Sequence, residues 1–292
     1  MALPLQNGKT AALASWTCPS CGSAAMTRYC GNCGERSLAG ATSIEGGEAA
    51  PGPRRSFMGR LRASLGALAS PPGQLTAEWM RGQRVGYLAP LSLFLWINVA
   101  FFVVQSASGL GVLTWPLRVH LSDDSIAWIT ARLLAQHRPD MTVPTDAYAS
   151  VFNALESVHA KSLVIVMVPA FAAVLGVLLP DRRHGFKDAL TFAFHFFAFS
   201  LIWLSALFPT VVIVASLLAA IGIPLPSHHS ADLVITSLEC AVLAWYLYVA
   251  LGTVFGVSTP RRLVAVPVLV AALYVMLKAY HAVVFVATLY SI

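Results

Sequence analysis

Five long apolar runs constrain the fold of this chain more than any other feature. They cover residues 87–108, 162–179, 189–222, 233–257 and 263–289. A helix needs about 20 mostly apolar residues to cross a bilayer. Only 11% of the 292 residues are charged, whereas a soluble domain carries about 25%. We therefore predict an all-α integral membrane protein, and this composition excludes a disordered chain and argues against a soluble globular domain.

The third run decides the number of spans, because it is too long for one span and too short for two spans plus a turn. The charge of the loops favours a single helix. Splitting the run would place Arg261 and Arg262 outside the membrane, against the tendency of Lys and Arg to stay inside. We predict five transmembrane helices with the N-terminus inside and the C-terminus outside. The third helix is expected to be long and kinked near Pro209.

The chain divides into four parts. Residues 1–37 contain a cysteine module, residues 38–53 form a flexible linker, residues 54–86 form basic amphipathic juxtamembrane helices, and residues 87–292 form the five-span domain. The first fifteen residues hold no apolar run of the kind that signal peptides need, so we expect the N-terminus to stay in the cytoplasm.

Basic residues surround the apolar stripe of the juxtamembrane helices. They are Arg54, Arg55, Arg60, Arg62, Arg81 and Arg84. Such a helix can lie on an anionic membrane surface. It can equally pack against the protein's own membrane domain, and the pattern does not separate these two arrangements.

The long outer loop, residues 109–161, has amphipathic helices of its own. One is expected to begin after Ser122-Asp123-Asp124. Thr145 could cap a second helix that runs straight into the second span. The apolar face of the second helix is predicted to comprise Tyr148, Val151, Phe152, Leu155 and Val158. These helices could lie flat on the outer surface or cap an outward-facing cavity.

The cysteine module is the strongest motif in the chain. It consists of Cys18-Pro-Ser-Cys21, eight intervening residues and Cys30-Gly-Asn-Cys33, and each pair is followed by a glycine. Two pairs with this spacing suit a tetrahedral zinc–thiolate site. Four cysteine ligands leave no open position, so we predict a structural zinc ion. Redox-active pairs are the alternative, but the surrounding βαβ pattern of a thioredoxin-like site is missing.

A cysteine module that holds a structural zinc ion is called a zinc ribbon. The ribbon predicted here carries little positive charge. Arg28 lies between the cysteine pairs and Arg36 just after them, which is too sparse for phosphate binding. We therefore expect no nucleic acid and favour docking of a protein partner or a sensing role close to the membrane, with a purely architectural role as the alternative.

Ionisable residues inside the spans are candidate functional positions, because their burial in hydrocarbon is costly. Glu239 and Lys278 are expected at the same depth, close to His281, and could form an ion pair. Such a pair could pin two helices together or line a gated proton or solute site, or the two side chains could reach the outer interface separately. His195 is expected to be a packing histidine, and Asn98 an interhelical hydrogen-bond donor.

Several motifs together resemble a known family. They are the ribbon, Pro72-Gly73, Arg81-Gly82-Gln83-Arg84, Tyr87, Pro90 and the stretch from Lys187 to His195. The chain resembles an uncharacterised bacterial membrane family, a domain of unknown function with an N-terminal zinc ribbon. The resemblance implies a location in the bacterial inner membrane. This sequence departs from the family at Asp188, where the family often has Glu beside an extra His. The difference weakens the case for His195 as a metal ligand.

Three classes of function follow from these features. We favour a membrane adaptor, or a regulatory or assembly protein, that contacts the lipid bilayer, recruits a protein partner through its ribbon and could also assemble with further copies of itself. The alternative is a transporter of small solutes or ions with a polar site at Glu239, Lys278 and His281. A lipid-acting enzyme is least favoured, because the chain lacks the phosphate-binding, metalloprotease and serine-hydrolase motifs.

Overall fold

The computed structural model describes residues 15–37, 56–69, 71–108, 111, 113–140, 144–180, 184–224 and 227–292. The predicted linker at 38–53, together with Arg54 and Arg55, lies outside the described residues. The chain forms two compact units. The first comprises the described residues up to Ala67 together with Ala77–Ala89, and the second comprises Leu68–Thr76 and Pro90–Ile292.

The first unit contains the cysteine module and most of the juxtamembrane segment. Strands β1 (Trp16–Thr17) and β2 (Ala24–Ala25) pair antiparallel, with Trp16 opposite Ala25. Helix α1 (Phe57–Ala69) is followed by α2 (Gln74–Met80). The Ser64 hydroxyl accepts a hydrogen bond from the backbone N–H of Leu88 at 2.9 Å, so the segment that follows α2 turns back onto α1.

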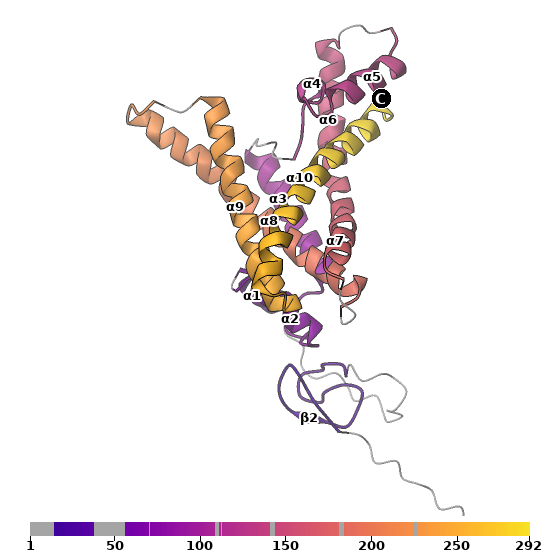
Figure 1. Ribbon diagram of the computed structural model, residues 1–292, viewed down its shortest axis with the longest axis vertical. Coiled ribbons are helices and arrows are strands. Elements are labelled where there is room, and N and C mark those ends of the chain that lie inside the picture. Colours follow the sequence, from indigo (N-terminus) through magenta and orange to yellow (C-terminus); the bar gives the residue numbers. More distant parts are fainter. Residues whose placement is uncertain are drawn as a thin grey trace, which may run out of the picture. The chain divides into compact units, whose positions relative to one another are not determined.

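The second unit is almost entirely helical (Figure 1). Its helices are α3 (Pro90–Ser108), α4 (Leu117–Ser122), α5 (Ala127–His137), α6 (Asp146–Leu163), the 3-10 turn η1 (Val164–Val166), α7 (Met167–Leu178), α8 (Phe186–Ala220), α9 (His228–Phe255) and α10 (Thr259–Leu289). In the described part of the chain, five helices are long and apolar enough to cross a membrane: α3, the continuous run from α6 to α7, α8, α9 and α10.

The prediction of five membrane helices is therefore confirmed. The third apolar run, residues 189–222, belongs to a single 35-residue helix, α8, that contains Pro209. The prediction that the second outer helix continues into a span is also confirmed, because α6, η1 and α7 follow one another without a break. Since Thr145 accepts a hydrogen bond from the backbone N–H of Tyr148 at 3.3 Å, the expected cap is present as well.

The core of the second unit is rich in aromatic rings. The ring of Phe171 on α7 stacks on Phe196 of α8, with centroids 5.0 Å apart. The ring of Phe199 stacks on Tyr246 of α9 at 4.1 Å. Helix α8 packs against α3 and α7, while α10 packs against α6, α7 and α9. The apolar stripes of these helices therefore meet in one bundle.

A short segment before α3 inserts into this bundle. Leu68, Leu75 and Thr76 are all buried. Gly73 has a φ of +85°, and a Cβ atom there would lie 2.9 Å from the Cα atom of Ala250 on α9. Only glycine fits both the left-handed backbone and this close approach.

The outer helices cap one end of the bundle. Figure 1 shows α4 and α5 beside the C-terminal end of α10 and the start of α6. Their common core consists of Leu117, Leu134, Tyr148, Phe152, Phe285 and Leu289. The predicted face of the second outer helix is partly wrong. Val151 and Val158 are exposed, and the buried side repeats every four residues at Tyr148, Phe152, Glu156 and Ala160.

The far halves of α8 and α9 differ from the rest of the bundle. No described side chain between positions 208 and 245 is buried. Exposed apolar residues there include Val212, Ile213 and Leu217 on α8 and Leu233 and Val234 on α9. These halves present an apolar surface that the described parts of the protein leave open.

Candidate functional site

The four cysteines of the first unit form a compact cluster. Their sulfur atoms all lie within 4.8 Å of one another. The Sγ atoms of Cys18 and Cys33 are 3.4 Å apart, and those of Cys21 and Cys30 are 3.5 Å apart. A tetrahedral zinc site with bonds of about 2.3 Å separates its sulfurs by about 3.8 Å. The cluster could therefore hold a metal ion, and its all-thiolate donor set favours zinc.

The two halves of the cluster repeat the same backbone turn. The N–H of Gly22 donates to the carbonyl of Cys18 at 2.8 Å, and the N–H of Gly34 donates to the carbonyl of Cys30 at 2.8 Å. Gly22 and Gly34 have φ values of +72° and +77°. Glycine adopts this left-handed geometry without strain, which explains the residue that follows each cysteine pair.

The thiols differ in their surroundings. Burial raises the pKa of Cys18 and of Cys33, whereas hydrogen bonds from Ser23 lower the pKa of the exposed Cys21 thiol to about 6. The five cysteines form no disulfide. Because thiolates are the form that binds metal, the low pKa of Cys21 suits it as an entry point for an ion.

Glu35 fastens the cysteine cluster to the juxtamembrane segment. Its side chain is 2% exposed. One carboxylate oxygen accepts hydrogen bonds from the Ser20 hydroxyl at 2.6 Å and from the backbone N–H groups of Arg84 and Val85 at 2.8 and 2.9 Å. The Gln83 amide also donates to the carbonyl of Pro19 at 2.9 Å. Sequence reasoning missed Glu35, whose partner lies 49 residues away.

The basic juxtamembrane residues that the structure describes are solvated to different degrees. Arg62, Arg81 and Arg84 are exposed, whereas Arg60 is half-buried. The Arg84 guanidinium lies over the Trp79 ring, 5.5 Å from its centroid. The contact of these arginines with an anionic membrane surface stays a prediction.

The predicted Glu239–Lys278 pair is wrong. The Lys278 ammonium donates instead to Asp123, between α4 and α5, at 2.6 Å. It also lies over the Trp115 ring at 4.6 Å. Glu239 is half-buried and makes no hydrogen bond or ion pair with any described residue. Depth along the spans pointed to a partner in another span, whereas Asp123 belongs to the segment between the first and second candidate spans.

Aromatic and imidazole rings surround this ion pair. The His281 ring stacks on Trp115 with centroids 3.9 Å apart and planes 9° apart. His120 lies close by, 6.2 Å from His281, and contacts Phe152 and Phe285. Neither ring nitrogen of His120 has a hydrogen-bond partner among the described residues. Because His120 is fully buried, its pKa is lowered to about 4.

Two polar residues of α6 hold the start of α4 in place. The Glu156 carboxylate, which is 1% exposed, accepts a hydrogen bond from the backbone N–H of Trp115 at 2.9 Å. The Asn153 side-chain carbonyl accepts one from the N–H of Leu117 at 2.8 Å. Sequence reasoning missed Glu156, although its position one turn after Phe152 on the buried face is a signal that could have found it.

His195 is fully buried on α8, and its Nδ1 atom lies 2.9 Å from the hydroxyl of Thr76. The buried Oδ1 atom of Asn98 has no hydrogen-bond partner within the described ranges, and the role of Asn98 as an interhelical donor stays a prediction.

Comparisons with known proteins agree with this architecture. Residues 59–102 match a family model described as a protein of unknown function (DUF3667). This region runs from α1 into α3. Neither a curated protein nor a solved structure matches the chain. The family match, the cysteine cluster and the five apolar helices fit an uncharacterised membrane family.

Proposed function

We propose that this chain is a non-enzymatic membrane adaptor or assembly protein, whose zinc ribbon recruits a protein partner at the cytoplasmic face of the bacterial inner membrane. The attachment of the ribbon through Glu35 carries the proposal. Glu35 binds the backbone at Arg84 and Val85, only a few residues before α3 begins at Pro90. A ribbon held in this way is presented at a fixed place on the juxtamembrane segment rather than on a loose tether.

The chemistry of the ribbon supports recruitment rather than catalysis. Four thiolates complete a tetrahedral coordination shell, so a bound zinc ion has no position for substrate or water. Met26, between the two cysteine pairs, is 62% exposed. An exposed methionine adapts its shape to a partner surface and is common at docking sites.

The charge distribution supports a cytoplasmic N-terminus. If each candidate helix crosses the bilayer, one side receives the ribbon together with Arg81, Arg84, Lys187, Arg261 and Arg262. Lys and Arg concentrate on the cytoplasmic side of membrane proteins. The open apolar halves of α8 and α9 would then contact lipid or further copies of the chain.

The test uses crosslinking in living cells. A photo-crosslinking amino acid replaces Met26 in the full-length protein, and Cys18→Ser is added to disrupt the ribbon. We expect one defined protein to be crosslinked at Met26, at least tenfold less in the Cys18→Ser background and equally well with Cys240→Ser. Cys240 is the matched control because it is a free cysteine outside the ribbon. No defined adduct, or an adduct that persists with Cys18→Ser, would contradict the adaptor function.

The alternative is a transporter of small solutes or ions. Its site would not include Glu239, which lies apart from Lys278. The observation that favours it is a group of buried polar side chains from α4, α6 and α10, namely His120, Glu156 and His281. Solute flux in proteoliposomes that survives Cys18→Ser but is lost with His120→Phe would support transport over recruitment.

A further inference from the structure

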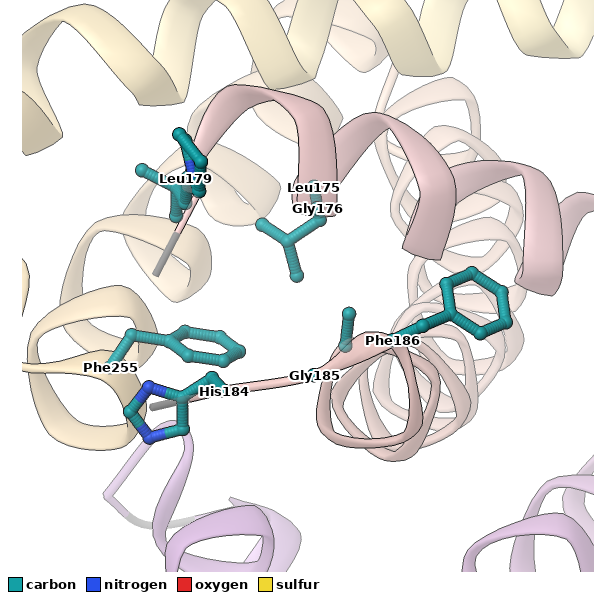
Figure 2. A pocket seen from close by; sticks show the side chains of 9 residues that line it. Leu175, Gly176, Leu179, His184, Gly185, Phe186 and Phe255 are labelled. Atoms are coloured by element: carbon teal, nitrogen blue, oxygen red, sulfur yellow. The ribbon is translucent and has the colours of Figure 1, made fainter. Parts of the chain in front are cut away.

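Two neighbouring hollows open where four membrane helices end. The first has a volume of about 520 Å³ and lies between the end of α7 and the start of α8. Figure 2 shows Leu175 and Gly176 on one side and Phe255 with His184 on the other. The second has a volume of about 910 Å³ and lies between the end of α7 and the α9–α10 turn. Leu179, Pro180 and Phe255 line both hollows.

We propose that the second hollow is a binding site for one anionic phospholipid, with the headgroup at Arg261 and an acyl chain against the apolar wall. This goes beyond the proposed adaptor function and does not depend on it. The walls supply the apolar part of the site. Leu178 and Leu179 come from α7, Val257 from the turn, and Val264 from α10.

The polar end of the hollow is cationic. Arg261 lines it, is exposed, and makes no ion pair with any residue that the structure describes. The Ser258 hydroxyl lies beside it and forms no capping hydrogen bond with α10. Among the described residues that line the two hollows, none is an Asp or Glu. A phosphate group therefore meets a positive charge and a hydroxyl donor there.

The depth of the site fits a lipid better than a soluble anion. The lining residues include the ends of two candidate spans, at Leu178 and Phe255, and the first turn of a third, at Pro260. If these helices cross the bilayer, their ends lie at the level where headgroups meet acyl chains. Basic pockets between membrane helices on the cytoplasmic side bind acidic lipid headgroups. Val264 is 66% exposed and continues the apolar wall towards the hydrocarbon.

Native mass spectrometry of the full-length protein tests the proposal. Purified protein is titrated with phosphatidylglycerol or phosphatidylcholine of the same chain length. We expect phosphatidylglycerol to be retained preferentially, and Arg261→Gln to weaken that retention about fivefold, the effect of one basic residue at a charged membrane surface. Arg132→Gln is the control, because Arg132 is an exposed arginine on α5, distant in sequence from the hollow. It should leave retention unchanged.

A second variant tests the site without disturbing the fold. Ser258 is the N-cap of α10, and Asp is also a favoured N-cap residue. Ser258→Asp should therefore preserve the helix while its carboxylate repels the lipid phosphate. Glycerol phosphate, a soluble anion, should not compete. Equal retention of the two lipids, indifference to both variants, or displacement by glycerol phosphate would overturn the proposal.

Discussion

The ammonium of Lys278 on α10 lies 2.6 Å from the carboxylate of Asp123, which follows α4, and the two residues are 155 positions apart in the chain. This ion pair joins the outer helices to the last membrane helix. Each side chain is only 18% exposed. Burial raises the pKa of Asp123, but the hydrogen bond and charge of Lys278 outweigh it, and the net pKa lies below its ordinary value.

Removing one partner should destabilise the protein. Lys278→Met keeps the apolar part of the side chain but leaves Asp123 charged and poorly solvated. For a pair that is neither fully buried nor exposed, we expect a loss of about 2 kcal/mol in the free energy of unfolding. Thermal unfolding in detergent micelles measures this loss of stability. The double variant with Asp123→Asn should lose less than the sum of the two single changes.

Glu239→Gln provides the matched control. Since Glu239 contacts no charged group among the described residues, its substitution should leave the unfolding temperature unchanged. A loss as large as that of Lys278→Met would show that Glu239, rather than Asp123, stabilises the lysine.

The buried His120 should make stability depend on pH. Its pKa is about 4 in the folded protein because burial disfavours the charged ring, against 6.5 in the unfolded chain. Between these values the unfolded chain binds the additional proton, so stability is full above pH 6.5 and falls as the pH drops towards 4. The contribution is about 3 kcal/mol.

His120→Phe isolates this effect. Phenylalanine suits a site surrounded by Trp115, Phe152 and Phe285, so the variant should fold. Its unfolding temperature should decrease less between pH 7 and pH 4.5 than that of the unchanged protein. An unaltered decrease in His120→Phe would place the pH sensitivity at other groups.

Glu35→Gln should release the ribbon from the juxtamembrane segment without loss of metal. The amide oxygen of glutamine is an uncharged and therefore weaker acceptor for the N–H groups of Arg84 and Val85, whereas hydrogen bonds to a charged acceptor contribute about 1.5–3 kcal/mol each. Trypsin should then cleave after Arg81 or Arg84 at least about tenfold faster. Asn32→Ala, on the exposed side of the ribbon, should leave the rate unchanged. Equal rates for Glu35→Gln and the unchanged protein would show that Glu35 is not the attachment.

Local patterns were sufficient to predict the helices and the cysteine cluster. The length of an apolar run and the spacing of two cysteine pairs depend on nearby residues alone, and both predictions agree with the structure. The single helix α8 followed from loop charge, which is also a property of the sequence. The Thr145 cap likewise depends on a residue only three positions away.

Contacts between distant segments could not be predicted in this way. The partner of Lys278 was sought among the spans, because the position of the outer helices above α10 has no periodic signal. Glu35 resembled a solvated surface residue, and only the folded chain brings it to Arg84. The exposed Val151 shows the same limitation, since an apolar side chain on α6 can face protein or lipid.

A closed four-thiolate site separates a structural ribbon from a catalytic or redox centre. X-ray absorption at the zinc edge, measured on the purified full-length protein, identifies the ligands. We predict one zinc ion per chain with four sulfur ligands at about 2.3 Å, lost with Cys18→Ser and retained with Cys240→Ser. A nitrogen or oxygen ligand in the first coordination shell, or protein free of zinc with its cysteines oxidised in pairs, would contradict it.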